Sequence, residues 1–149
     1  MRGFVNAILA LSLMAIVVAC GGGGSHSVEM HDRVGSLWLD PEEFTYENSD
    51  TLYRRNISIN VRYDGDYVAD SVPLKILTIS PDSMVLEEDF TLHIPHLADM
   101  RPEEHTFIYR SKVLLKRSGI YRFRLTPLEP VEGIASVGLI VDERPVENE

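Results

Sequence analysis

The sequence has 149 residues, a formal net charge of −9 at pH 7 and one cysteine. That length is enough for one domain with its own hydrophobic core but not comfortably for two. The acidic balance argues against nucleic acid as a partner, whose binding needs clustered Lys and Arg, and against attraction to anionic lipid surfaces. The lone cysteine excludes a disulfide framework.

The first twenty residues have the pattern of a bacterial lipoprotein signal. Arg2 precedes an almost wholly apolar run over residues 4–18, and small residues then lead to Cys20. The run is shorter than the roughly 20 apolar residues of a spanning helix, so residues 1–19 are predicted to be cleaved rather than kept as a helical anchor. Lipidation of Cys20, with chains such as palmitate, would hold the protein on a bilayer, since each buried methylene contributes about 0.8 kcal/mol.

Glycine and serine dominate the segment after Cys20. Residues 21–27 read Gly-Gly-Gly-Gly-Ser-His-Ser, and such a tract loses too much backbone entropy on ordering to belong to a core. We therefore expect the lipidated cysteine and a flexible tether over residues 20–34. A single domain is expected over residues 35–142, with an acidic tail over residues 143–149.

From Gly35 onward the hydrophobic pattern has mostly a period of two, which is typical of half-buried strands. Strands are predicted at residues 57–63, 72–79, 84–94, 107–115 (broken midway), 120–125 and 134–141, with a short additional one at 36–39. About seven short strands without a long amphipathic helix predict an all-β fold, an antiparallel β-sandwich of immunoglobulin-like or jelly-roll-like type. A closed barrel fits nearly as well, because periodicity does not reveal which strands pair.

The search for chemistry gives one candidate metal site, formed by His93, His96 and His105. Neutral imidazoles bind zinc or copper when several converge, but strand residues three apart point to opposite faces, so loop histidines are the simpler interpretation. No phosphate loop, nucleophile elbow or zinc-protease helix is present in the sequence. We therefore expect no catalytic residue, no metal, no cofactor and no enzyme activity.

Two segments rich in acid and proline, residues 40–48 and 96–104, are predicted to be loops that contact a partner. The aromatic residues at or beside the first segment, Trp38, Phe44 and Tyr46, are the candidate partner-binding residues. The same side chains equally complete a core, which is the simpler interpretation for Trp38. The basic pairs at 54–55 and 116–117 are interpreted as solvated strand faces rather than phosphate sites.

The pattern as a whole resembles the gliding-motility-associated lipoprotein H family of Bacteroidota. The resemblance includes the signal, Trp38, residues 50–53 and 57–63, Ser118-Gly119-Ile120-Tyr121-Arg122-Phe123 and residues 133–139. It covers nearly the whole chain after the signal, and its matching positions are strand residues and turn glycines rather than catalytic groups. Residues 93–105 depart from the family, which has a turn with glycine and tryptophan there.

The resemblance implies an outer-membrane lipoprotein that is accessory to surface adhesin movement or to the associated secretion system, with other envelope proteins as partners. Surface-exposed lipoproteins of such bacteria carry acidic residues directly after the lipidated cysteine, and residues 21–27 contain none. We therefore expect the protein to face the periplasm. The alternative is an envelope lipoprotein that binds a glycan or a metal, through the aromatic residues or the histidines.

Overall fold

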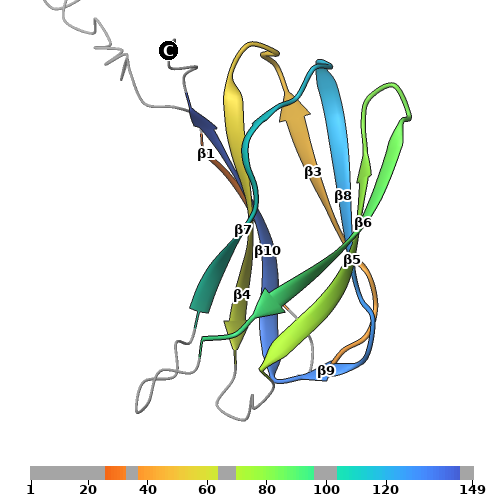
Figure 1. The fold of residues 1–149 in the computed structure, drawn as a ribbon, viewed down its shortest axis with the longest axis vertical. Coiled ribbons are helices and arrows are strands. Elements are labelled where there is room, and N and C mark those ends of the chain that lie inside the picture. The colour runs from red at the N-terminus through yellow and green to blue at the C-terminus, as the bar shows by residue number, and fades with distance from the viewer. Residues whose placement is uncertain (1–25, 33–36, 64–69, 96–103, 145–149) are drawn as a thin grey trace, which may run out of the picture.

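The structure, a computed structural model, describes residues 26–32, 37–63, 70–95 and 104–144. Within these ranges the regular structure is entirely β-strand. No helical segment there has the length and apolar character of a membrane span. The strands, shown in Figure 1, are β1 (His26–Asp32), β2 (Leu37–Trp38), β3 (Glu42–Asn48), β4 (Arg54–Tyr63), β5 (Ser71–Ile79), β6 (Val85–His93), β7 (Glu104–Leu114), β8 (Gly119–Pro127), β9 (Val131–Glu132) and β10 (Ile134–Arg144).

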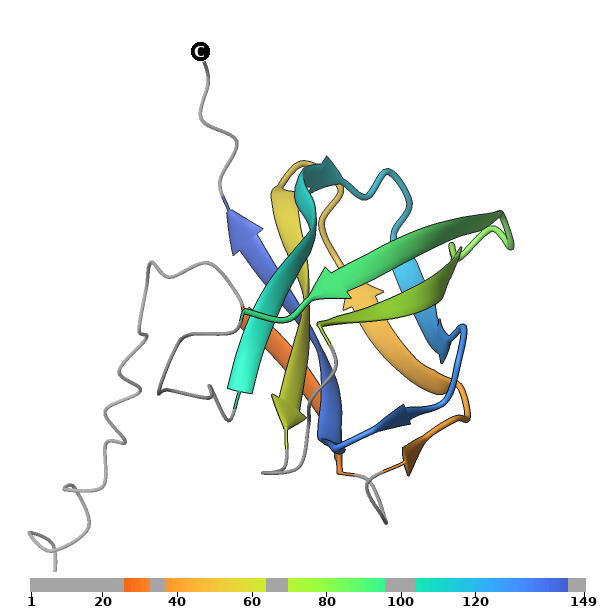
Figure 2. The ribbon, with the colours of Figure 1, turned by 60° about the horizontal axis from the view of Figure 1, so that its bottom comes forward.

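Two four-stranded antiparallel sheets face each other. The first sheet has the strand order β1-β10-β4-β7 and the second has the order β3-β8-β5-β6, while β2 and β9 form a short ribbon. Figure 2 shows the two layers with the interior between them. The predicted antiparallel sandwich is confirmed, and the closed alternative is not adopted, because no strand ladder joins the two sheets in the described part of the chain.

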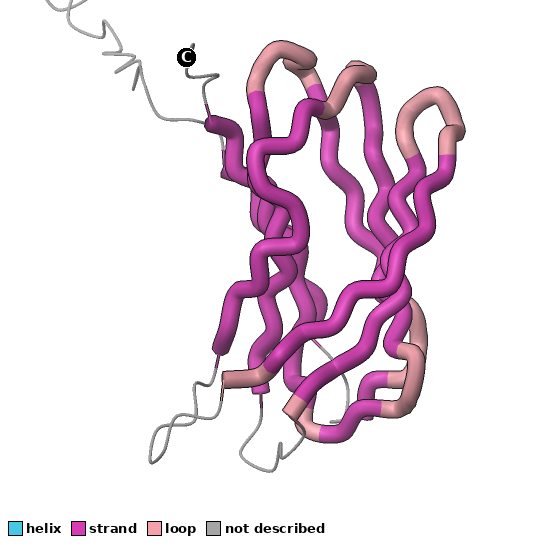
Figure 3. The backbone as a smooth tube through the Cα atoms, viewed as in Figure 1, coloured by secondary structure: helices cyan, strands magenta, loops and turns pink. Residues whose placement is uncertain are grey.

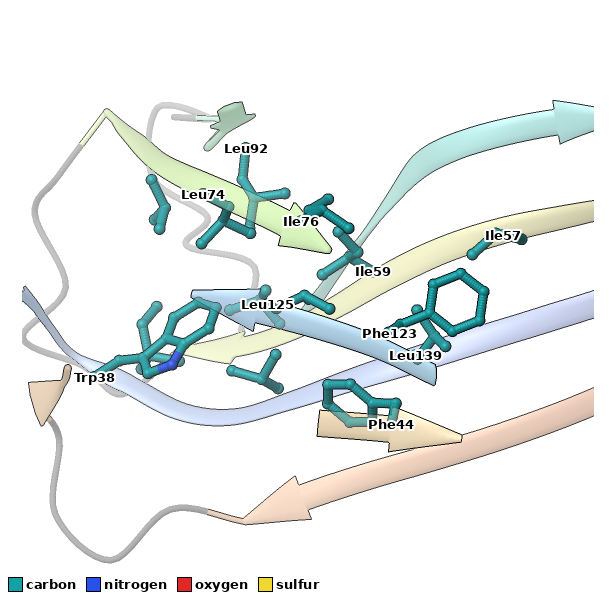
Figure 4. Packing of buried hydrophobic residues seen from close by; sticks show 14 of the residues in the cluster. Trp38, Phe44, Ile57, Ile59, Leu74, Ile76, Leu92, Phe123, Leu125 and Leu139 are labelled. Carbon is teal, nitrogen blue, oxygen red and sulfur yellow. The ribbon is translucent and has the colours of Figure 1, made fainter. Parts of the chain in front are cut away.

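Alternating side chains of both sheets fill the interior. From the first sheet come Ile57, Ile59, Val61, Val137, Leu139 and Val141, and from the second come Phe44, Val72, Leu74, Ile76, Tyr121, Phe123 and Leu125. Figure 4 shows these rows meeting between the strands, with Trp38 at one end. Each buried large apolar side chain stabilises the fold by about 1.5–3 kcal/mol, so this core is the main reason that the two sheets stay together.

The chain forms more strands than the seven expected, and two of the additional ones correct earlier assignments. Residues 26–32 were predicted to belong to the tether but form β1, which pairs with β10 over its whole length. Residues 42–48 were predicted to be a loop but form β3, which pairs with β8. The first sheet therefore includes residues of the predicted tether, from His26 onward, and of the predicted tail, up to Arg144.

Three loops lie together at one end of the sandwich, which we call the upper end and define as residues 49–53, 80–84 and 115–118 (Figure 3). The turn expected at residues 80–83 is confirmed, since Ser83 N–H donates to Ser80 O at 2.9 Å. β10 ends at the upper end and β1 begins there, because His26 is paired with Asp142.

Arg55 is buried in the interior just below the upper end, with no exposed surface. Its guanidinium donates to Tyr46 Oη at 2.8 Å and to the carbonyls of Tyr53 and Asp50, each at 2.6 Å. Glu143 Oε1 lies 3.3 Å from Nη2 and accepts a hydrogen bond from Tyr46 Oη at 2.8 Å. The interpretation of residues 54–55 as a solvated pair is therefore wrong for Arg55, whose bonds hold the β3–β4 loop in place.

Candidate functional site

The two sheets have four edge strands, β1 and β7 in the first sheet and β3 and β6 in the second. An edge strand exposes a row of unpaired backbone N–H and C=O groups that can pair with a strand of another protein. Proteins protect such edges with charges, bulges or covering side chains. An edge that lacks such protection is where this sandwich can add a strand.

The edges of β1 and β3 are joined to each other by side-chain hydrogen bonds. Glu29 Oε2, on β1, accepts the backbone N–H of Thr45 at 2.9 Å, so that one free donor of β3 is already satisfied. His31 lies between two carboxylates, with Nε2 3.1 Å from Glu29 Oε1 and Nδ1 3.0 Å from Glu42 Oε2. Its ring stacks on Phe44, with centroids 4.4 Å apart. Both edges are therefore covered on this side of the molecule.

The carboxylates around His31 also set its protonation. Burial lowers the pKa of His31, but the hydrogen bonds and charges of Glu42 and Glu29 raise it by more, and the net pKa lies above 6.5. A protonated imidazole donates from both nitrogens, which suits a ring held between two carboxylates. The β1–β3 contact is thus strongest when His31 carries its proton.

The β7 edge is interrupted by two irregularities. The pairing with β4 shifts between Ile57 and Ser58 and again between Arg55 and Ile57. At the second shift Lys112 has a positive φ of 53°, and Asn56 Oδ1 accepts its backbone N–H at 2.9 Å. Bulges bend a strand and break the regular row of hydrogen-bonding groups, so β7 is a poor template for another strand.

The β6 edge is regular. All nine of its residues pair in unbroken register with β5, from Ser71 opposite His93 to Ile79 opposite Val85. Ile94 N–H donates to Asp70 O at 2.9 Å, and in an antiparallel pair such bonded positions alternate with unbonded ones. The backbone groups of the odd-numbered residues of β6 therefore point away from β5, and within the described residues no strand pairs with them.

Side chains on both faces hold β6 in place, and among the described residues none bonds to its outward backbone groups. On the outer face Lys75 Nζ contacts Glu87 Oε1 at 2.7 Å and Asp89 Oδ1 at 3.9 Å. On the inner face Glu88 accepts hydrogen bonds from Tyr109 Oη at 2.6 Å and from Arg110 Nη2. Register places Tyr109 at the irregularity of β7 opposite Ile57 and Ser58, and the side chains of Tyr109 and Arg110 both reach from β7 to Glu88 on β6.

The hydrogen bonds at Glu88 favour its charged form. The Tyr109 hydroxyl, followed by Arg110, lowers the pKa of Glu88, while burial and the same carboxylate raise the pKa of Tyr109. A carboxylate that is fully ionised and bonded to two donors is suited to joining the sheets rather than to exchanging protons. The chemistry that this region offers is hydrogen bonding along an extended backbone.

The aromatic residues proposed to bind a partner lie elsewhere. Trp38 and Phe44 have no exposed surface and Tyr46 is 5% exposed, all within the core. The Trp38 indole donates to Asp40 O at 2.9 Å. The partner-binding prediction for these residues is therefore corrected and the core alternative is confirmed, because β3 turns Phe44 and Tyr46 inward. A glycan platform built from them is wrong for the same reason.

Four predicted site residues remain, namely Cys20 and the three histidines. Cys20 and His96 lie outside the described residues. His93 is exposed at the end of β6, and His105, at the start of β7, packs edge-on against Phe107 with centroids 4.5 Å apart. In the parts of the chain that the structure describes, no three His, Cys, Asp or Glu side chains are grouped to hold a metal ion.

Sequence reasoning predicted β6 as a strand but not as an edge. Strand order is a long-range property, and the run of three acidic residues from Glu87 to Asp89 gave no sign that Glu88 faces inward while its neighbours face outward. The alternation of apolar residues could have indicated this, because Phe90 and Leu92 lie on the same face of the strand as Glu88.

The fold and this edge define the class of protein: an all-β sandwich with one regular, uncovered edge strand among those described.

No protein-family model and no curated protein matches the chain. Among solved structures it is similar to a chain from "Structure of infectious bursal disease virus Gt strain", with 9% identity and a TM-score of 0.27. The match covers 84% of this chain and 36% of that chain, about a third of its length. A similarity this low assigns neither a family nor a function.

Proposed function

We propose that the protein is a non-enzymatic lipoprotein, anchored through Cys20 in the outer membrane and facing the periplasm. It acts as an interaction module of an envelope motility or secretion assembly, as the resemblance to the gliding-motility-associated lipoprotein H family implies. The observation that carries the interaction role is the regular edge of β6, in a molecule whose other three edges are fastened or bulged.

The mode of interaction follows from this geometry. An extended segment of a partner pairs with the outward backbone groups of β6 and becomes a fifth strand of the second sheet. Main-chain hydrogen bonds supply affinity, and the side chains of Val85, Glu87 and Asp89 select the partner's side chains on the outer face. The exposed carboxylates favour a segment that alternates apolar and basic residues.

The anchor is tested by replacing Cys20, the only cysteine of the chain. Cys20→Ser is expected to give an unprocessed precursor that takes up no labelled fatty acid in cells. Normal labelling of this variant would contradict the lipoprotein assignment.

The interaction role is tested by cross-linked pull-down of the lipidated protein from its own membranes. Asp89→Pro removes an outward N–H of β6 without removing a bond to β5, whereas Asp89→Ala removes the same carboxylate and keeps that N–H. We expect envelope components to be recovered with native protein and with Asp89→Ala, and to be lost with Asp89→Pro. Equal recovery with both variants, once circular dichroism has shown that both are folded, would remove β6 from the interface.

A further inference from the structure

The exposed apolar side chains of the sandwich are concentrated at the upper end. Of the thirteen large apolar residues that are exposed among those described, seven lie in the three upper loops or within two residues of them. They are Leu52, Tyr53, Met84, Val85, Leu86, Leu114 and Ile120. Scattered surface apolar residues need no explanation, but a cluster at one end of a molecule indicates an interaction surface.

Exposed cations lie at the same end. Residues 49–54, 80–84 and 112–118 contain Arg54, Lys112, Lys116 and Arg117 together with the carboxylates Asp50 and Asp82. Glu47 of β3 and Asp142 and Glu143 of β10 lie at the level of these residues on the neighbouring strands. Arg117 is paired with Asp82 at 2.9 Å, and among the described residues no carboxylate pairs with the other three cations. The loop residues described at the opposite end contain Asp40, Asp70 and Glu129 and no Lys or Arg.

The upper loops are held in fixed positions. Arg55 fastens the β3–β4 loop through the carbonyls of Asp50 and Tyr53. Asn48 Nδ2 donates to Leu115 O at 3.0 Å and to Arg117 O at 2.7 Å, which fixes the β7–β8 loop. A shallow depression open to solvent lies between the loops, lined by Thr51, Pro81, Asp82, Lys116, Arg117 and Ser118. A surface ordered before binding loses little conformational entropy when it docks.

The course of the chain places this end next to the predicted lipid anchor. β1 begins at the upper end, opposite Asp142, and Cys20 precedes His26 by six residues. Six residues span at most about 20 Å when fully extended. A lipidated Cys20 would therefore keep the upper end, with its apolar and basic side chains, within about that distance of the membrane surface.

We infer that the upper end docks on the bilayer that carries the anchor. Leu52, Tyr53 and Met84 enter the interface between headgroups and acyl chains, and Arg54, Lys112 and Lys116 bind anionic headgroups. This inference builds on the lipid-anchor part of the proposed function. It differs from the expectation drawn from the net charge, because the net charge averages over the whole chain. In this orientation β6 begins at the membrane-facing end with Val85 and runs away from the membrane, so its edge from Glu87 onward stays open to a partner.

The first test compares the two ends of the lipidated, full-length mature protein in vesicles of phosphatidylcholine and phosphatidylglycerol. An environment-sensitive fluorophore is attached at Leu52→Cys or, as the matched control, at Leu128→Cys; these positions are 74% and 51% exposed at opposite ends. We expect blue-shifted emission and quenching by nitroxide-bearing lipids for Leu52→Cys alone. Equal, water-like emission from both labels would overturn the inference and would leave this surface to a protein partner.

Mass spectrometry of the same samples separates this inference from the proposed function. Absence of acyl chains on Cys20 would refute the anchor. Acylated protein with a water-exposed label at Leu52→Cys would refute only the docking.

The second test measures the contribution of charge, by vesicle sedimentation of the mature chain carrying Cys20→Ser. Lys112→Asn with Lys116→Gln removes two upper-end cations, and asparagine suits the positive φ of 53° at residue 112. Each basic residue near an anionic surface raises the vesicle-binding constant about five-fold. We therefore expect the binding constant of this double variant to be about 25-fold lower at low salt. Arg62→Gln with Arg124→Gln, which changes net charge equally elsewhere, is the control, and equal weakening by both pairs would overturn the inference.

Discussion

Replacing Arg55 by alanine removes one of the largest fully buried side chains and leaves its hydrogen-bonding partners in place. The two loop carbonyls and the Tyr46 hydroxyl each lose a donor, and Glu143, whose side chain is 18% exposed, loses its cation. Breaking a buried ion pair from one side costs about 3–5 kcal/mol, and we expect a loss in this range because the two buried loop carbonyls and the Tyr46 hydroxyl also lose their donor. For a domain of this size, that loss lowers Tm by about 10–20 °C.

Arg54→Ala is the matched control for this prediction. Arg54 is exposed, and within the described part of the chain its side chain makes one hydrogen bond, from Nη1 to Lys112 O at 3.1 Å, so its removal costs about 0.5 kcal/mol. Urea unfolding followed by the fluorescence of Trp38, the only tryptophan and a buried one, measures both variants. Equal free energies of unfolding for Arg54→Ala and Arg55→Ala would refute the role given to the buried network.

Two further predictions concern the β1 edge. Because the pKa of His31 is raised, its contribution to the free energy of unfolding is fully present below the unfolded pKa of about 6.5 and is lost as pH rises through the higher folded value. Urea titrations of native protein and His31→Gln should therefore converge above that range, and a constant difference at all pH values would contradict this. Gly138→Ala should destabilise by about 1–3 kcal/mol, since its Cβ would lie 1.9 Å from Met30 Sδ and 3.0 Å from the Glu29 carbonyl oxygen. Met30→Ala should recover part of that loss in thermal unfolding, and no recovery would show that the backbone contact dominates.

The strands of the core could be predicted from sequence because their alternation follows burial. In β8 Tyr121 and Phe123 face inward while Arg122 and Arg124 face water, as predicted. β1 shows the opposite arrangement. Val28 and Met30 are exposed on its outer face, whereas Glu29 and His31 point inward to the β3 edge. An edge strand with charged residues on its inner side has no hydrophobic pattern to detect, and this is why the sequence predicts a tether there.

The buried position of Arg55 was not predictable for a related reason. A guanidinium is buried only where several acceptors converge, and its acceptors come from Tyr46, Asp50, Tyr53 and Glu143, which are spread over three segments of the chain. The β6 edge likewise depends on strand order and on the bulges of β7. Local sequence thus indicates the strands, while the site depends on how distant strands meet.

Photo-crosslinking from β6 in native membranes tests the central claim most directly. A photoreactive amino acid at position 89, in the middle of the regular edge, is compared with one at position 45 of β3, where Glu29 already accepts the backbone N–H. The proposed strand addition predicts adducts with an envelope protein from position 89 and none from position 45. Adducts from position 45 without any from position 89 would contradict it.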